Sequence, residues 1–104
     1  MILENNVAMG YNLVGDIMKV KDNFILKKIA DSYVVIPVRS RTVDFSGVIK
    51  LTESASVLWQ MLEKGAEREE LVARLLEEYE VDDNTARDDV DRFLQKLREA
   101  DLIE

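Results

Sequence analysis

The sequence predicts an α+β fold in which three β-strands come first and three α-helices follow. Between residues 24 and 51, short runs of β-branched and aromatic residues are separated by turn residues, a pattern typical of strands. From residue 52 onward, apolar residues recur at helical spacing behind residues that cap helices. With 104 residues, 47% of them hydrophobic, the chain is long enough for one domain with one core.

The predicted strands begin with a hairpin. Phe24–Ile29 and Tyr33–Ile36 lie on either side of a short turn, Ala30–Ser32. Pro37 cannot donate a hydrogen bond to a sheet, so we expect it at the end or the free edge of its strand. The third strand is predicted at Val48–Leu51, with a start as early as residue 43. A sheet this small has an exposed edge.

The predicted helices follow directly. Thr52 is a favourable N-cap for the first helix, and Gly65 ends it. The second helix is predicted from about Glu67 to Tyr79, and the third begins after the N-cap Asp82 and ends near Ala100. The apolar residues that recur at helical spacing are Ala55, Leu58, Trp59, Leu62, Leu71, Val72, Leu75, Leu76, Ala86, Val90, Phe93, Leu94 and Leu97. Trp59 and Phe93 are expected in the core, because both lie on these apolar stripes.

Residues 1–18 differ from the rest and are predicted to be an N-terminal extension of a domain formed by residues 19–104. They contain three asparagines and two glycines among apolar residues without a sustained period. One interpretation is a tail or a start codon upstream of the true one. The other is that residues 11–17 dock as an added strand.

The composition excludes most catalytic chemistry for the chain acting alone. It has no cysteine and no histidine, so thiolate nucleophiles, zinc–thiolate sites and the commonest general base are absent. No segment has the ~18 consecutive apolar residues of a membrane span. The Asp82-Asp83-Asn84 run lacks the glycine and the terminal glutamate of a calcium loop, and helix capping explains it. We therefore expect a cytoplasmic protein that is not an enzyme, with no metal, no cofactor and no membrane partner.

The charge is unevenly distributed along the chain. Residues 1–51 carry seven Lys and Arg against five Asp and Glu, whereas residues 52–104 carry seven against sixteen. Helices joined by short turns beside a hairpin suggest a winged helix-turn-helix, an architecture that commonly binds DNA. Residues 82–104, however, carry eight acidic and four basic side chains, which opposes binding to a polyanion. No nucleic-acid partner is expected.

The outer edge of the third predicted strand is not explained by the core. In this sequence, only residues 1–18 are left to cover it. An uncovered edge offers main-chain N–H and C=O groups to an extended peptide. From Lys19 to Glu104 the chain resembles the PqqD family, the recognition element for precursors of ribosomally made, post-translationally modified peptides. The resemblance is carried, in order, by Phe24-Ile25-Leu26, Tyr33-Val34-Val35-Ile36-Pro37, Gly47-Val48-Ile49-Lys50-Leu51-Thr52-Glu53-Ser54-Ala55, Leu58-Trp59, Glu70-Leu71-Val72, Leu75-Leu76, Tyr79, Asp89-Val90, Phe93-Leu94, Leu97 and Leu102-Ile103. Two positions depart from the family pattern: Ser46 replaces a common asparagine, and Asp101 replaces the usual glycine.

The resemblance implies that the chain binds the leader of a precursor peptide as an added strand, in a cleft between the third strand and the third helix. It also implies presentation of the peptide to a modifying enzyme, commonly a radical S-adenosylmethionine (SAM) protein. The matching positions are Val48, Ile49, Lys50 and Leu51 on the strand edge and Val90, Phe93, Leu94 and Leu97 on the helix wall, although some of the second group must serve the core instead. Together with Lys50, Arg39 and Arg41 at the rim would favour an acidic peptide.

Two other functions are open at this point. The same sheet edge suits a self-association module, in which two copies form a homodimer by exchanging strands. A winged-helix DNA-binding protein is the less favoured alternative.

Overall fold

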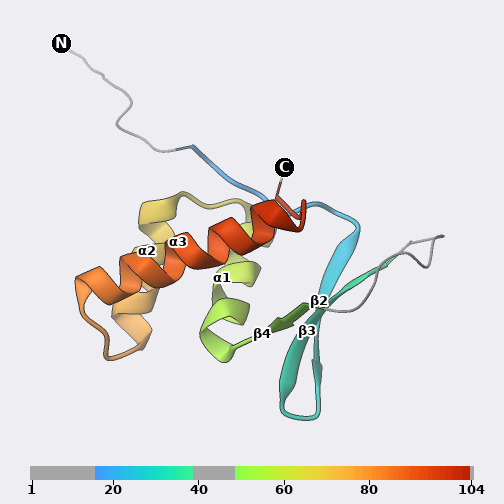
Figure 1. Ribbon diagram of the computed structural model, residues 1–104, viewed down its shortest axis with the longest axis horizontal. Coiled ribbons are helices and arrows are strands. Elements are labelled where there is room, and N and C mark those ends of the chain that lie inside the picture. The colour runs from blue at the N-terminus through green and yellow to red at the C-terminus, as the bar shows by residue number, and fades with distance from the viewer. Residues whose placement is uncertain (1–15, 39–48, 104) are drawn as a thin grey trace.

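The computed structural model describes residues 16–38 and 49–103. Three strands, β2 (Phe24–Ile29), β3 (Ser32–Pro37) and β4 (Ile49–Leu51), precede three helices, α1 (Glu53–Lys64), α2 (Arg68–Glu78) and α3 (Asp83–Glu99). The predicted α+β fold and its element order are therefore confirmed. In Figure 1, α3 runs across the other two helices, and the β2–β3 hairpin projects away from them.

The described strands form one antiparallel sheet in the order β2-β3-β4. The pairing of Ile29 with Ser32 leaves Ala30 and Asp31 as a two-residue loop, in which Ala30 has a positive φ of 56°. Pro37 is the last residue of β3, as its missing N–H predicts. The short β4 pairs only with the other end of β3, from Tyr33 opposite Leu51 to Val35 opposite Ile49.

Side-chain and backbone caps set the helix boundaries. The Oγ1 of Thr52 accepts a hydrogen bond from the N–H of Ala55 at 3.1 Å, and Asp82 accepts one from the N–H of Thr85 at 2.7 Å. Both N-caps predicted from sequence are therefore confirmed. The first helix ends at Gly65, whose φ of 96° lies in a region that L side chains rarely adopt.

The core lies between the three helices and one face of the sheet. Trp59, Leu62 and Leu71 are fully buried at its centre, and the indole N–H of Trp59 donates to Glu63 at 3.1 Å. On the sheet side, Val35 and Leu51 join the same cluster. Because side chains alternate along a strand, Lys50 and Val34 lie on the opposite, outer face, where Lys50 is exposed and Val34 is buried.

Residues 16–23 are tied to the helical part of the domain. Met18 and Ala66 exchange two backbone hydrogen bonds, of 2.8 and 2.9 Å, and the N–H of Lys21 donates to Leu102 at 2.9 Å. Met18, which the sequence pattern placed in the N-terminal extension, is thus bonded to the domain. Residues 1–15, including most of that extension, lie outside the described residues.

Candidate functional site

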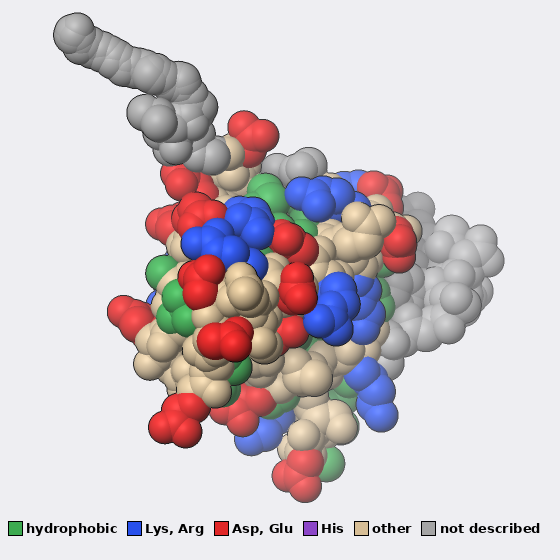
Figure 2. Space-filling model, turned by 60° about the vertical axis from the view of Figure 1, so that its left-hand side comes forward, with side chains coloured by type: hydrophobic (Ala, Val, Ile, Leu, Met, Phe, Trp, Pro, Cys, Tyr) green, Lys and Arg blue, Asp and Glu red, His purple; other side chains and the backbone are tan. Residues whose placement is uncertain are grey.

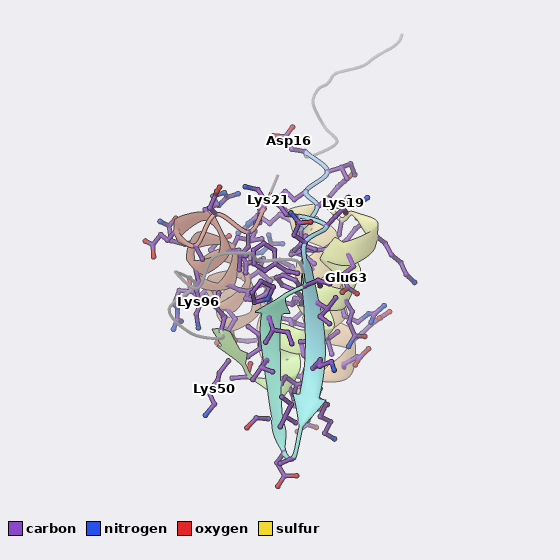
Figure 3. All side chains as sticks on the ribbon, turned by 90° about the vertical axis from the view of Figure 1, so that its right-hand side faces the viewer. Asp16, Lys19, Lys21, Lys50, Glu63 and Lys96 are labelled. Atoms are coloured by element: carbon purple, nitrogen blue, oxygen red, sulfur yellow. The ribbon has the colours of Figure 1, made fainter. Side chains whose placement is uncertain are left out.

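An open groove lies between β4 and α3. Its volume is about 410 Å³, and its lining comes from β4, the turn into α1, and all three helices. Apolar side chains form its floor, namely Leu51, Ala55, Leu58, Leu75 and Phe93. Lys50 stands on the strand side, and Asp89, Arg92 and Lys96 stand on the helix side. Figure 3 shows Lys50 and Lys96 projecting from the same flank of the molecule.

Two further hollows extend this groove. One of about 310 Å³ continues past Thr52 to Tyr79 and Val81 at the end of α2. The other, of about 480 Å³, runs from Lys50 to Tyr33 and the hairpin tip. Thr52 borders all three hollows, so they adjoin at the start of α1 and together form a track.

The direction of the backbone groups of β4 follows from the hairpin register. A two-residue loop makes Ile29 and Ser32 a hydrogen-bonded pair, and such pairs then alternate along the ladder. The hydrogen bond from the N–H of Val38 to the carbonyl of Asn23, at 2.8 Å, continues that alternation. Val34 therefore bonds to β2, whereas Tyr33 and Val35 bond to β4.

It follows that Ile49 and Leu51 direct their N–H and C=O groups toward β3, and Lys50 directs both of its groups away from the sheet. No described strand pairs with this outer edge of β4. Residues 16–38 and 49–103 thus present one unpaired donor and one unpaired acceptor at Lys50, beside the groove. An extended peptide can pair with both.

Of the four residues predicted to form the helix wall, only Phe93 lines the groove. Val90, Leu94 and Leu97 are at most 2% exposed and belong to the core, so they do not reach a peptide in the groove. Phe93 is also mostly buried, at 7% exposure, but it lines the groove floor. The wall is formed instead by the next stripe of α3, which is Asp89, Arg92, Phe93 and Lys96.

Sequence reasoning missed the three charged members of this stripe, although a signal was present. Asp89, Arg92 and Lys96 have the same i, i+3, i+7 spacing as the core residues of this helix. Each of them comes one position before a residue of the apolar stripe. Of the predicted strand residues, Lys50 and Leu51 line the groove, and Ile49 packs against the core. Val48, Arg39 and Arg41 lie outside the described residues.

The wall helix α3 is held against α2 by a network of ion pairs. Arg68 of α2 donates two hydrogen bonds, of 2.7 and 3.0 Å, to the carboxylate of Asp91. Arg87 of α3 donates to Glu69 and to Asp83, both at 2.8 Å. The hydrogen bond from Arg68 holds the pKa of the Asp91 carboxyl below its ordinary value, and Arg87 does the same for Glu69.

The network lies at the surface, so its main consequence is the orientation of α3 rather than a large stabilisation. Figure 2, which brings the helical side forward, shows acidic and basic side chains intermixed there. The face shown carries no continuous basic surface of the kind that tracks a nucleic-acid backbone.

Tyr79 closes the far end of the track. Burial raises the pKa of its phenol, and the nearby carboxylates of Glu53 and Glu78 raise it further. The group therefore stays protonated at neutral pH and can donate a hydrogen bond. Its ring, with Leu75 and Val81, gives this end of the track an apolar lining.

Residues 16–38 and 49–103 contain no cluster of three or more acidic side chains placed to hold a metal ion. Within the same ranges, no helix is long and apolar enough to cross a membrane.

The fold and the groove define a small α+β domain that offers a strand edge and an apolar floor side by side. The chain belongs to the PqqD family, described as coenzyme PQQ synthesis protein D, which it matches over residues 32–103. The family resemblance stated from sequence is thereby confirmed. No curated protein sequence is significantly similar to the chain.

Two solved structures have similar folds. One, "TbiB1 in Complex with the TbiA(beta) Leader Peptide", is 29% identical, with a TM-score of 0.66 over 83% of this chain and 94% of that one. The other, "Lasso peptide synthetase B1 complexed with the leader peptide", is 20% identical, with a TM-score of 0.66 over 84% of this chain and 96% of that one. At 20% identity the second supports the fold alone.

Proposed function

We propose that this chain binds the leader of a precursor peptide by β-strand addition to the outer edge of β4. The observation that carries the proposal is the outward N–H and C=O of Lys50 next to the apolar groove. The N–H and C=O of Lys50 can bind the backbone of any extended peptide, and the groove selects among peptides by their side chains. Membership of the PqqD family and the leader-bound neighbour at 29% identity support the same function.

The proposed binding mode divides the peptide side chains between two faces. Since side chains alternate along a strand, every second one points to the side of the sheet where Leu51 lies. These side chains meet the groove floor formed by Leu58 and Phe93. The others pass over the outer face beside Lys50. A leader with apolar residues at alternate positions therefore fits the site.

A titration of isotope-labelled protein with its cognate leader peptide tests this proposal. We expect the amide signals of residues 49–52 and 89–96 to shift most, because these segments form the two sides of the groove. The signals of the α1–α2 turn around Gly65, on the far side of the core, are the internal control. Saturable binding that leaves residues 49–52 unshifted would rule out strand addition at β4.

The partner that receives the peptide is part of the proposal. The sequence resemblance implies that this partner is a radical SAM enzyme. The chain itself is then a recognition subunit rather than an enzyme, consistent with its lack of histidine and cysteine. Its expected location, the cytoplasm, is that of ribosomal precursor synthesis. Co-purification of the chain with each enzyme encoded beside it, with and without leader, tests this partner; leader-dependent binding only to an enzyme of another class would contradict the expectation.

Self-association is the second candidate, because an unpaired strand edge also accepts a second copy of the same edge. Light scattering on the full chain and on a chain shortened to begin at Asp16 separates the two functions. A shortened monomer that binds leader supports recognition. A dimer whose mass and stability do not respond to leader supports assembly.

A further inference from the structure

The groove differs in charge from the protein around it. The whole chain has a formal net charge of −7, and most of the excess acid lies in its C-terminal half. The groove is lined by three basic side chains, Lys50, Arg92 and Lys96, and by one acidic side chain, Asp89. A basic strip therefore lies beside an apolar floor on an acidic protein.

Among the residues that the structure describes, these basic groups have few partners. No carboxylate of the described residues lies within ion-pair distance of Lys50 or Lys96. Arg92 approaches Asp89 at 3.7 Å, and its side chain is 78% exposed. By contrast, the arginines of the α2–α3 network make ion pairs of 2.7 to 2.9 Å. The charges of the groove are thus available to a ligand.

We propose that the groove selects an acidic extended peptide, and that Lys50 and Lys96 determine this charge selection from opposite sides. The inference rests on the proposed leader binding and names the class of leader. Exposed charges interact over about 8 Å at physiological ionic strength, so the side chains that line the groove weigh most, and the three basic ones there outnumber the single acidic one.

The positions of the two lysines specify where the acidic residues of the peptide lie. Lys50 lies on the outer face of β4, so a peptide residue on that face of the added strand lies about 5 Å from it between Cβ atoms. Lys96 stands above Phe93 on the helix side of the groove. A peptide that alternates acidic with apolar residues presents carboxylates to Lys50 and apolar groups to the floor. Lys96, on the other side of the groove, attracts these carboxylates at longer range.

Three synthetic twelve-residue peptides test the proposal. They share the same apolar residues at alternate positions and carry glutamate, glutamine or lysine at the others. Binding is measured by amide shifts and by fluorescence anisotropy at low and physiological salt. We expect the glutamate peptide to bind more tightly than the glutamine peptide, by about two- to fivefold for each lysine engaged, with the preference shrinking as salt is added.

Charge reversal supplies a gain of binding that a misfolded protein cannot imitate. The K50E/K96E variant is expected to prefer the lysine peptide over the glutamate peptide. The K19E/K64E variant is the matched control, because it changes the net charge equally, and Lys64, like Lys96, lies in the last turn of its helix. Lys19 and Lys64 do not line the groove, and Figure 3 shows Lys19 far from Lys50. The control variant should keep the preference for glutamate.

The outcomes separate this inference from the function on which it rests. Equal affinity for all three peptides, with shifts at residues 49–52, would refute charge selection and leave leader binding intact. If K50E/K96E and K19E/K64E lose the preference for the glutamate peptide equally, the preference comes from the overall charge of the protein, and the inference is also refuted. Binding of all three peptides away from the groove would refute both proposals.

Discussion

A proline at Lys50 separates the backbone contribution to binding from every other property of the site. Proline has no N–H, and the register directs the N–H of Lys50 toward the peptide rather than toward β3. Ile49, which would precede the proline, is already in a strand, the conformation that a following proline favours. The domain should therefore fold normally, because the edge of a sheet tolerates proline.

The expected loss follows from one hydrogen bond. A typical intramolecular hydrogen bond contributes about 0.5–1.5 kcal/mol net, which corresponds to an increase in Kd of about two- to twelvefold. The proline also removes the lysine charge, so its affinity is compared with that of Lys50→Gln, which removes the charge and retains the N–H. The difference between these two variants, measured by titration calorimetry with the leader, is the backbone contribution.

Ile49→Pro provides the contrasting position. Its N–H is directed toward Val35 of β3, so this substitution breaks the ladder of the domain itself and should lower the free energy of unfolding by about 1–3 kcal/mol. Lys50→Pro should leave thermal unfolding nearly unchanged. If Lys50→Pro and Lys50→Gln bind leader equally, or if Lys50→Pro is the less stable of the two proline variants, the deduced edge geometry is wrong.

Three further predictions concern the domain as a whole. Leu94→Ala should lower the free energy of unfolding by about 2–5 kcal/mol in urea denaturation, because the side chain is 2% exposed and fills the core. A loss below 1 kcal/mol would contradict this placement and favour the predicted position of Leu94 on the groove wall. Ala30→Gly should raise the melting temperature, since it relieves a left-handed conformation that costs an L-residue about 1–2 kcal/mol; a lower melting temperature would contradict this reading of the turn. The free energy of unfolding should decline as pH falls from about 5 to 3, because Arg68 lowers the pKa of Asp91 in the folded protein. A carboxyl group with a lowered folded pKa stabilises the fold while it is ionised. This stabilisation is lost as the group becomes protonated. Arg68→Gln should make the decline shallower, and Asp88→Asn, on the same helix, is the control; equal acid profiles for the two variants would show that this pair does not contribute.

Local sequence patterns predicted the elements well because their causes are local. Thr52 and Asp82 cap helices through bonds to residues three positions away, and Pro37 ends a strand because it lacks a donor. Asp101, which stands where the family usually has glycine, does adopt a positive φ of 61°. Its carboxylate pairs with Lys21 at 3.0 Å, a contact between distant residues that no local pattern contains.

The helix wall shows where a pattern along one helix is insufficient. The apolar stripe of α3 includes Val90, Phe93, Leu94 and Leu97, and nothing along the helix distinguishes residues that fill the core from residues at its border. That distinction depends on where α1, α2 and β4 lie. With the helices packed, Phe93 borders the groove while its neighbours are enclosed.

The sequence by itself determined the α+β order, the caps, the lack of nucleophilic thiol and imidazole groups, and the family to which the chain belongs. Each of these depends on residue type or on spacing within one element. Only the tertiary structure decided that Lys50 is the residue of β4 whose backbone groups point away from β3, with no pairing strand among the described residues, and that Lys96 and Arg92 face it across an apolar floor. Those facts depend on hydrogen-bond register and helix packing, which bring together residues separated by more than forty positions in the chain.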